Sequence, residues 1–115
     1  MKKENIIKES RDFTKIINLK QKVKNSYYSI YYKKNNTYIN RYGITIPKKT
    51  GKAVVRNKIK RQIKNIVDQN NLAIQKPYDY VIIIKKEILN LTYQEKEKEL
   101  IELLKKIGER HEKAN

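Results

Sequence analysis

The sequence contains no cysteine and only one histidine, and this excludes several kinds of chemistry. Without thiols the chain has no disulfide partner, no thiolate metal site and no cysteine nucleophile. The single His111 lies among charged residues near the end of the sequence, where we expect a solvated side chain. A histidine-based catalytic dyad or zinc site is therefore not predicted, and no residue is assigned as a metal ligand.

Long apolar runs are also missing. The longest wholly apolar stretch is Val81 to Ile84, far shorter than the roughly 20 residues that span a bilayer. The first residues, MKKEN, carry charge with no apolar run behind them, so they do not resemble a signal peptide. We therefore expect a cytoplasmic protein. Its 115 residues are the size of one ordinary domain, covering residues 1–115.

Acidic residues are absent from a long central part of the chain. Between Phe13 and Val67 there are 15 Lys or Arg residues and no Asp or Glu, whereas nine basic and nine acidic residues follow Val67. The formal net charge of +16 therefore belongs mainly to the first part of the chain. AT-rich coding would explain many lysines but not the absence of acids. We expect a polyanionic partner, nucleic acid rather than an anionic membrane surface.

Apolar spacing predicts a first and a second helix, each with one apolar face. The first covers residues 10–19, with Ser10 as a plausible N-cap. Its apolar face consists of Phe13, Ile16 and Ile17. The second covers residues 52–69. Its apolar arc consists of Val55, Ile59, Ile63, Ile66 and Val67.

A third helix is predicted near the end of the sequence. Thr92 and Glu95 have the spacing of a capping box, which marks a helix start. The helix is expected to continue to about Ile107, where Gly108 is a typical stop signal. Its buried stripe consists of Leu100, Leu103, Leu104 and Ile107.

Tyrosine-rich and isoleucine-rich segments predict strands between these helices. Residues 23–33 have the composition of one strand. A turn at residues 35–36 leads to residues 38–46, which supply the returning strand or strands. The apolar segment 80–84 indicates a central strand covered on both faces. The order of elements predicts an α+β sandwich in which helices pack on one sheet.

The second predicted helix concentrates positive charge away from its apolar arc. Its basic residues are Arg56, Lys58, Lys60, Arg61 and Lys64, and Lys48, Lys49 and Lys52 precede them. Cations near a helix N-terminus oppose the macrodipole, and like charges four residues apart repel. A helix selected only for packing would carry Glu at some of these positions, so the pattern indicates a site for phosphates. Asn57 can bond a phosphate or a 2′-hydroxyl, or it can simply be hydrated.

The stretch RNKIKRQIK is similar to the Arg-Asn-Arg signature of the bacterial ribonuclease P protein component family. Further blocks resemble the same family, in order and with matching spacing. They are RDFTKIINLKQKVKNSYYSIYY, RYGITIPKKTGKAVVRNKIKR, and YDYVIIIKK followed by LTYQEKEKELIELLKK. The likeness covers roughly residues 10–107. One departure is Lys58, where the signature prefers Arg, so the charge is kept but the bidentate geometry is lost.

The resemblance implies an α+β fold with the order α-β-β-β-α-β-α. It has one mostly antiparallel sheet, three helices and an uncommon left-handed βαβ crossover. The implied function is that of the protein subunit of an endoribonuclease, which helps to remove the 5′ leader from precursor tRNA. The implied partners are ribonuclease P RNA and precursor tRNA, with no membrane. The RNA subunit is expected to hold Mg²⁺ and to perform the chemistry, so no catalytic residue is assigned to this chain.

The resemblance also implies two sets of binding residues. The residues implied to contact RNA are Lys48, Lys49, Lys52, Arg56, Asn57, Lys58, Lys60, Arg61 and Lys64. Those implied to line a cleft for the single-stranded leader are Phe13, Ile17, Ser29 and Tyr31. Phe13 and Tyr31 can stack on unpaired bases, whereas Ile17 and Ser29 cannot. From the residues alone, Phe13 is as readily a core residue, and Tyr31 as readily packs within the sheet.

Three other classes of protein fit part of the sequence. A small ribosomal RNA-binding protein fits the composition equally well, but the aligned blocks weigh against it. A DNA-binding helix-turn-helix would need a short helix in place of YDYVIIIKK, which has strand composition. A membrane-surface helix would need a larger apolar face with Trp or Phe, and residues 53–67 contain neither.

Overall fold

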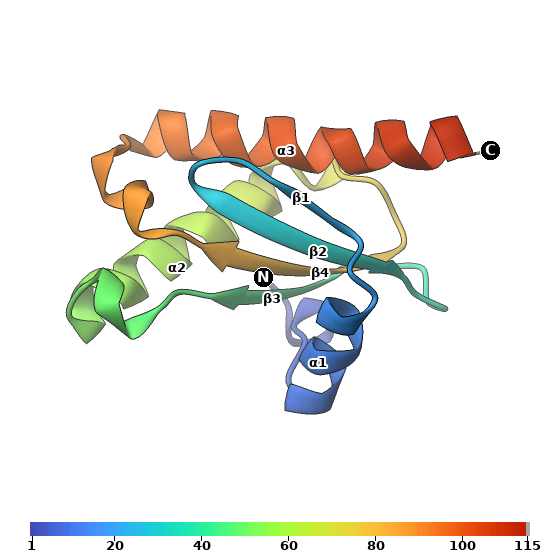
Figure 1. Cartoon of the computed structure of the whole chain (residues 1–115), viewed down its shortest axis with the longest axis horizontal. Helices are drawn as coiled ribbons and strands as arrows, with labels where there is room; N and C mark the ends of the chain where they lie inside the picture. Colours follow the sequence, from blue (N-terminus) through green and yellow to red (C-terminus); the bar gives the residue numbers. More distant parts are fainter. Residues whose placement is uncertain (115) are drawn as a thin grey trace.

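The computed structural model describes the backbone of residues 1–114 and the side chains of residues 1–109. Its strands are β1 (Lys22–Lys24), β2 (Tyr28–Lys34), β3 (Arg41–Thr45) and β4 (Tyr78–Ile84). Its helices are α1 (Ser10–Asn18), α2 (Ala53–Gln69) and α3 (Tyr93–Ala114). Short 3-10 helices are η1 (Lys3–Asn5), η2 (Lys48–Thr50), η3 (Asn71–Ala73) and η4 (Lys86–Asn90). The sheet separates α1 from α2 and α3 (Figure 1), so the predicted α+β sandwich is confirmed.

The four strands form one mixed sheet with the spatial order β1-β2-β4-β3. β2 pairs antiparallel with both β1 and β4, whereas β3 pairs parallel with β4. Every residue of β4 except Ile83 is buried, as expected for a central strand covered on both faces. The parallel pair is connected through α2, which is the expected βαβ unit; the left-handed sense of this connection stays a prediction.

The main core lies between the sheet and the two helices α2 and α3. The predicted stripe of α3 is buried there, as are Ile59, Ile63, Ile66 and Val67 of α2. Burying each large aliphatic side chain contributes roughly 1.5–3 kcal/mol before entropy costs.

Several tyrosines complete this core, and their hydroxyl groups have partners. Tyr28 Oη donates to the carbonyl of Lys96 at 3.0 Å, and Tyr80 Oη donates to the carbonyl of Gln75 at 2.6 Å. Burial raises the pKa of both hydroxyls, and burial also raises the pKa of Tyr42 to about 12. The rings therefore fill the core as neutral side chains at ordinary pH.

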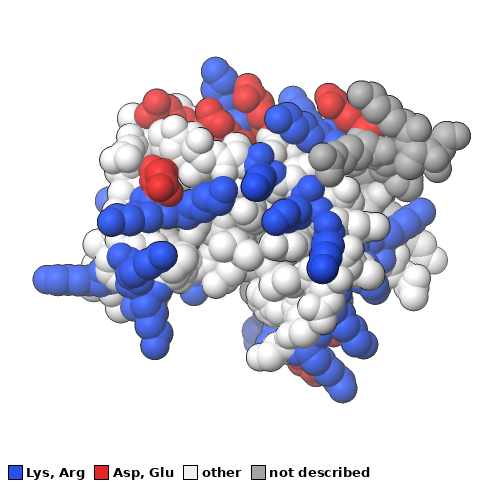
Figure 2. Space-filling model, in the orientation of Figure 1, with Lys and Arg blue, Asp and Glu red and all other residues white. Residues whose placement is uncertain are grey.

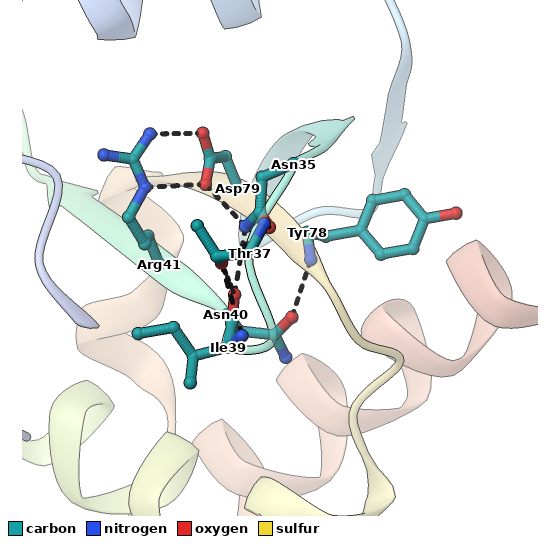
Figure 3. A network of polar contacts seen from close by, with 7 residues as sticks. All are labelled: Asn35, Thr37, Ile39, Asn40, Arg41, Tyr78 and Asp79. Atoms are coloured by element: carbon teal, nitrogen blue, oxygen red, sulfur yellow. Dashed lines mark hydrogen bonds and ion pairs between the residues drawn. The ribbon is translucent and has the colours of Figure 1, made fainter. Parts of the chain in front are cut away.

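The strand boundaries differ from the prediction in two places. The single strand expected over residues 23–33 is wrong, because a tight turn divides it into β1 and β2. Asn25 Oδ1 accepts hydrogen bonds from the backbone N–H groups of Tyr27 (2.8 Å) and Tyr28 (2.9 Å), which reverses the chain. The returning strand begins only at Arg41, because residues 35–40 form a hydrogen-bonded loop (Figure 3).

The first turns of the first two helices also differ from expectation. Ser10 is the first helical residue rather than the N-cap, a position that Glu9 occupies without a side-chain cap bond. Val55, expected in the apolar arc of α2, is 38 % exposed. It lies one turn before Ile59, the first residue of α2 that reaches the core.

The third helix begins as predicted but ends later. Thr92 N donates to Glu95 Oε1 at 2.9 Å and Glu95 N donates to Thr92 Oγ1 at 3.2 Å, so the capping box is confirmed. Gly108 does not stop the helix, which continues to Ala114. A glycine inside a helix costs only about 1 kcal/mol relative to alanine, too little to end one that packs along its length. The expected solvation of His111 lies outside the described side chains.

A polar network holds β3 against β4 (Figure 3). Arg41 Nε and Nη2 donate to the two carboxylate oxygens of Asp79 at 2.9 and 2.6 Å. Asn35 Nδ2 donates to Asp79 Oδ1 at 3.0 Å, and the backbone N–H of Tyr78 donates to Asn40 Oδ1 at 2.8 Å. Because Asp79 is buried, the bonds from Arg41 and Asn35 to its carboxylate offset the cost of removing its charge from water.

Gly43 of β3 lies directly beneath the Phe13 ring of α1. A Cβ atom added at Gly43 would overlap that ring. The missing side chain therefore lets α1 approach the sheet closely.

We predict that Gly43→Ala lowers the free energy of unfolding by about 1–3 kcal/mol, because α1 must move to avoid the overlap. Urea denaturation followed by circular dichroism measures this change. Gly108→Ala is the matched control, since a Cβ there meets Gln75 only at ordinary contact distance, 3.5 Å. It should raise stability by about 0.5–1 kcal/mol through helix propensity. Equal effects of the two substitutions would contradict the close approach of Phe13.

Candidate nucleic-acid interface

The nine residues predicted to contact RNA lie on one continuous part of the chain. Lys48 and Lys49 belong to η2, Lys52 is the N-cap residue of α2, and the others project from α2. We call this set the α2 surface: Lys48, Lys49, Lys52, Arg56, Asn57, Lys58, Lys60, Arg61 and Lys64. Arg56, Lys60 and Lys64 are half-buried along the border of the apolar arc, and the other members are exposed.

A shallow groove of about 420 Å³ runs along this surface. It is lined by Val54, Asn57, Lys60, Arg61 and Lys64. Val54 is 79 % exposed, so the groove combines an apolar side chain and an amide with three cations. This mixture suits a nucleotide, which presents a phosphate together with a sugar and a base.

Acids do not neutralise the α2 surface. Among residues 1–109, the ion pairs involve Glu9, Asp68 and Asp79, and none of their partners belongs to the α2 surface. Arg56 Nε donates instead to the carbonyl of Gly51 at 3.1 Å. Figure 2 shows acidic side chains gathered along α3, whereas Lys and Arg project at the opposite side, where α1 and the start of α2 lie. The positive charge is therefore available to a partner.

A further lysine lies beside the flank of α2. Lys96 of α3 is only 8 % exposed, and its Nζ donates to Gln62 Oε1 of α2 at 2.8 Å. Burial lowers the pKa of Lys96, and the positive charge of Lys58 lowers this pKa further. A neighbouring anion would relieve this repulsion.

The four residues predicted to line the leader cleft lie on the face of the sheet that α1 covers. Phe13, Ile17 and Tyr31 are partly buried and pack against the small cluster of Ile7, Ile16 and Val81. Ser29 precedes Tyr31 by two residues in β2, so alternation places it on the same face. We call these four residues the α1-side surface: Phe13, Ile17, Ser29 and Tyr31. The structure brings three of them onto one cluster and leaves the rings of Phe13 and Tyr31 partly accessible.

Tyr31 lies in a row that crosses the sheet. It is paired with Lys22 of β1 and Val81 of β4, and Val81 is paired with Gly43 of β3. Lys22 Nζ lies 5.6 Å from the centre of the Tyr31 ring, a cation–π distance. One ring of the α1-side surface therefore has a cation beside it, and the other, Phe13, rests on Gly43.

Sequence reasoning missed four residues that build these surfaces: Lys22, Gly43, Val54 and Lys96. Gly43 carried a signal, because an isolated glycine in a strand pattern often marks a close approach. Lys22 and Lys96 carried none, because their roles depend on pairing or packing between separate segments. Val54 lies outside the predicted apolar arc, and only its exposure in the structure places it in the groove of α2.

Two negative observations concern the residues that the structure describes. No group of three or more His, Cys, Asp or Glu side chains in this part is placed to hold a metal ion. Within the same part, every helix is too short or too polar to cross a membrane.

Comparison with known proteins identifies the family. The family model for ribonuclease P matches residues 1–108. The ribonuclease P protein component of Mycoplasma mycoides is 44 % identical over 108 residues, covering 93 % of this chain and 99 % of that protein. The chain belongs to the ribonuclease P protein family.

Solved structures of ribonuclease P proteins share the fold. The Thermotoga maritima protein superposes with a TM-score of 0.81 at 31 % identity, covering 87 % of this chain and 94 % of that one. A Staphylococcus aureus mutant with defective mRNA degradation activity gives 0.85 at 30 % identity, covering 92 % and 90 %. This membership decides against a ribosomal protein. The strand β4 decides against a helix-turn-helix, which would need a helix there.

The repulsion on α2 predicts that Lys60→Glu stabilises the free protein. The new carboxylate would lie four residues from both Arg56 and Lys64, and each such pair contributes about 0.3–0.5 kcal/mol. Urea denaturation at low salt should show the gain, and about 1 M salt should remove it. Lys60→Gln, which removes the charge without adding a carboxylate, should give a smaller gain. A loss of stability for Lys60→Glu at low salt would show that the repulsion is unimportant.

Proposed function

We propose that this chain binds ribonuclease P RNA through the α2 surface and helps that RNA to remove the 5′ leader of precursor tRNA. The observation that carries the proposal is the uncompensated charge of the α2 surface, in a family whose name implies an RNA partner. Each phosphate that a cation neutralises releases counterions and strengthens binding. Arg56 and Arg61 suit bidentate contacts, whereas Lys58 offers a single compact charge.

We further propose that the catalytic groups belong to the RNA subunit, together with the Mg²⁺ ions. The protein's own described side chains do not fit a magnesium site, since its carboxylates are not gathered in groups of three or more. The role of the chain is then electrostatic. It lowers the repulsion between two RNA molecules, so that substrate and metal ions bind more tightly without a general base from the protein.

The α1-side surface is the proposed site for the single-stranded leader. Phe13 and Tyr31 offer partly accessible rings, and Lys22 adds a cation beside Tyr31. Rings within a positive surface hold single strands by stacking, with little dependence on sequence. Ile17 and Ser29 add contact area but no stacking, so binding of the leader depends mainly on the rings of Phe13 and Tyr31. A cytoplasmic location remains part of the proposal, and cell fractionation tests it.

Reconstitution with ribonuclease P RNA tests the function. We expect the full chain to lower the Mg²⁺ concentration needed for leader removal. Arg61→Ala should weaken binding to the RNA and reduce the slope of log K against log salt by about one. Arg61 suits this test because it is exposed and makes no hydrogen bond or ion pair within residues 1–109.

Lys105→Ala is the matched control for that experiment. It also removes one exposed positive charge, but from α3, where acids balance the lysines. Its salt slope should match that of the unmodified chain. If the chain leaves the Mg²⁺ requirement unchanged, the proposed function is wrong; if both variants change the slope equally, the α2 surface is not the contact.

Tyr31→Ala tests the leader site. It should weaken binding of leader-bearing precursor to the reconstituted holoenzyme by roughly 1–3 kcal/mol, the range for one base stacked on an aromatic ring. Mature tRNA, which lacks the leader, should bind as before, and Tyr31→Phe should restore precursor binding. An equal loss for precursor and mature tRNA would remove the leader from this surface.

A further inference from the structure

Tyr38 is an almost fully exposed aromatic residue that neither surface above includes. Its side chain is 96 % exposed, in the loop of residues 35–40 between β2 and β3. A single exposed ring is common on protein surfaces and would mark nothing by itself. Tyr38 differs from such a ring because its loop is held by hydrogen bonds and lies beside exposed lysines.

The loop that carries Tyr38 is held by hydrogen bonds on both sides of the residue (Figure 3). Asn35 Oδ1 accepts from the backbone N–H of Thr37 at 2.9 Å, and Asn35 Nδ2 donates to the carbonyl of Ile39 at 3.0 Å. Thr37 Oγ1 also donates to that carbonyl at 3.0 Å. The backbone is thus ordered before any partner arrives, so a bound ligand would not have to immobilise it.

The charges around this loop favour an anion. Lys33 and Lys34 at the end of β2 are exposed. Lys76 is exposed as well, and the adjoining Pro77 accepts a hydrogen bond from the backbone N–H of Asn35 at 3.1 Å. The neighbouring acid, Asp79, is buried and paired with Arg41. Within residues 1–109 none of these three lysines forms an ion pair. An exposed ring beside such cations is the arrangement that binds single-stranded nucleic acid.

The position of the loop relates it to the proposed leader site. β2 carries Ser29 and Tyr31 and then leads directly into the loop, with Lys33 on the same face by alternation. β3 begins after the loop and ends before η2, so the loop and the start of the α2 surface lie at opposite ends of this strand. A strand of RNA that leaves the catalytic RNA near the α2 surface and passes Tyr31 would reach this loop last.

We propose that Tyr38 stacks on an unpaired base of the leader, farther from the cleavage site than the nucleotide held at Tyr31. The proposal rests on the function proposed above and extends the leader site along β2. The ring selects for an unpaired nucleotide rather than a duplex, because only an unpaired base exposes its face. The three lysines would contact the phosphates on either side of that nucleotide.

The test uses reconstituted holoenzyme and precursor tRNAs with leaders of different length. With a leader of about ten nucleotides, within the roughly 4–16 that one single-strand-binding domain covers, Tyr38→Ala should weaken binding about 5- to 10-fold. With a leader of about three nucleotides the same variant should bind normally, since the strand does not reach the loop. Tyr38→Phe should bind the long leader normally, and Tyr38→Leu should not, because leucine lacks a π face.

Tyr31→Ala, measured in parallel, separates this inference from the function on which it rests. If Tyr31→Ala weakens binding of the long leader and Tyr38→Ala does not, the inference is wrong and the leader site stands. If Tyr38→Ala weakens binding equally for long leader, short leader and mature tRNA, the ring contacts another RNA and the inference is also wrong. If neither variant has an effect and the chain does not lower the Mg²⁺ requirement, the proposed function itself fails.

Discussion

The two hydrogen bonds from the Arg41 guanidinium to the buried Asp79 carboxylate hold the edge strand β3 in register with the central strand β4. Apart from a single bridge between Ile6 and Tyr42, β3 pairs only with β4, and no hairpin aligns the two strands, so side chains help to fix the register. A buried carboxylate without a partner would cost several kcal/mol, which makes any other register unfavourable. This register directs Tyr42 into the core and places Gly43 beneath Phe13. It also sets where η2 and α2 begin, and therefore where the basic residues lie.

The two faces of the sheet have different roles because they are covered to different extents. α2 and α3 cover one face, and nearly all of the large buried side chains lie there. The short helix α1 covers only part of the other face, so Phe13, Ile17 and Tyr31 remain partly accessible. Stability thus comes mainly from one side of the sheet, which leaves the opposite side free to bind. The loop that carries Tyr38 follows directly after β2, the strand that carries Ser29 and Tyr31.

The charge distribution reflects a compromise between stability and binding. Arg56, Lys60 and Lys64 repel one another along α2, and Lys96 is buried beside Lys58. Acids along α3 balance the lysines of that helix but do not reach the α2 surface. The free protein tolerates this repulsion because the apolar arc of α2 is anchored in the main core. A polyanion on the outer side of α2 would remove this repulsion. The same residues that lower the stability of the free chain would therefore strengthen a complex.

The sequence by itself determined the apolar stripes of the three helices, the buried central strand, the capping box at Thr92 and the acid-free surface of α2. These features depend on spacing within one segment, where the period of a helix or strand is enough. Only the tertiary structure decided that Asn25 divides a predicted strand, that α3 continues through Gly108, and that Lys22 lies over Tyr31. It also decided that Phe13 rests on Gly43. The contacts of Phe13 with Gly43 and of Lys22 with Tyr31 join separate segments, and local periodicity carries no information about which of them meet. The turn at Asn25 is local, but its hydrogen bonds do not follow from the period of a strand.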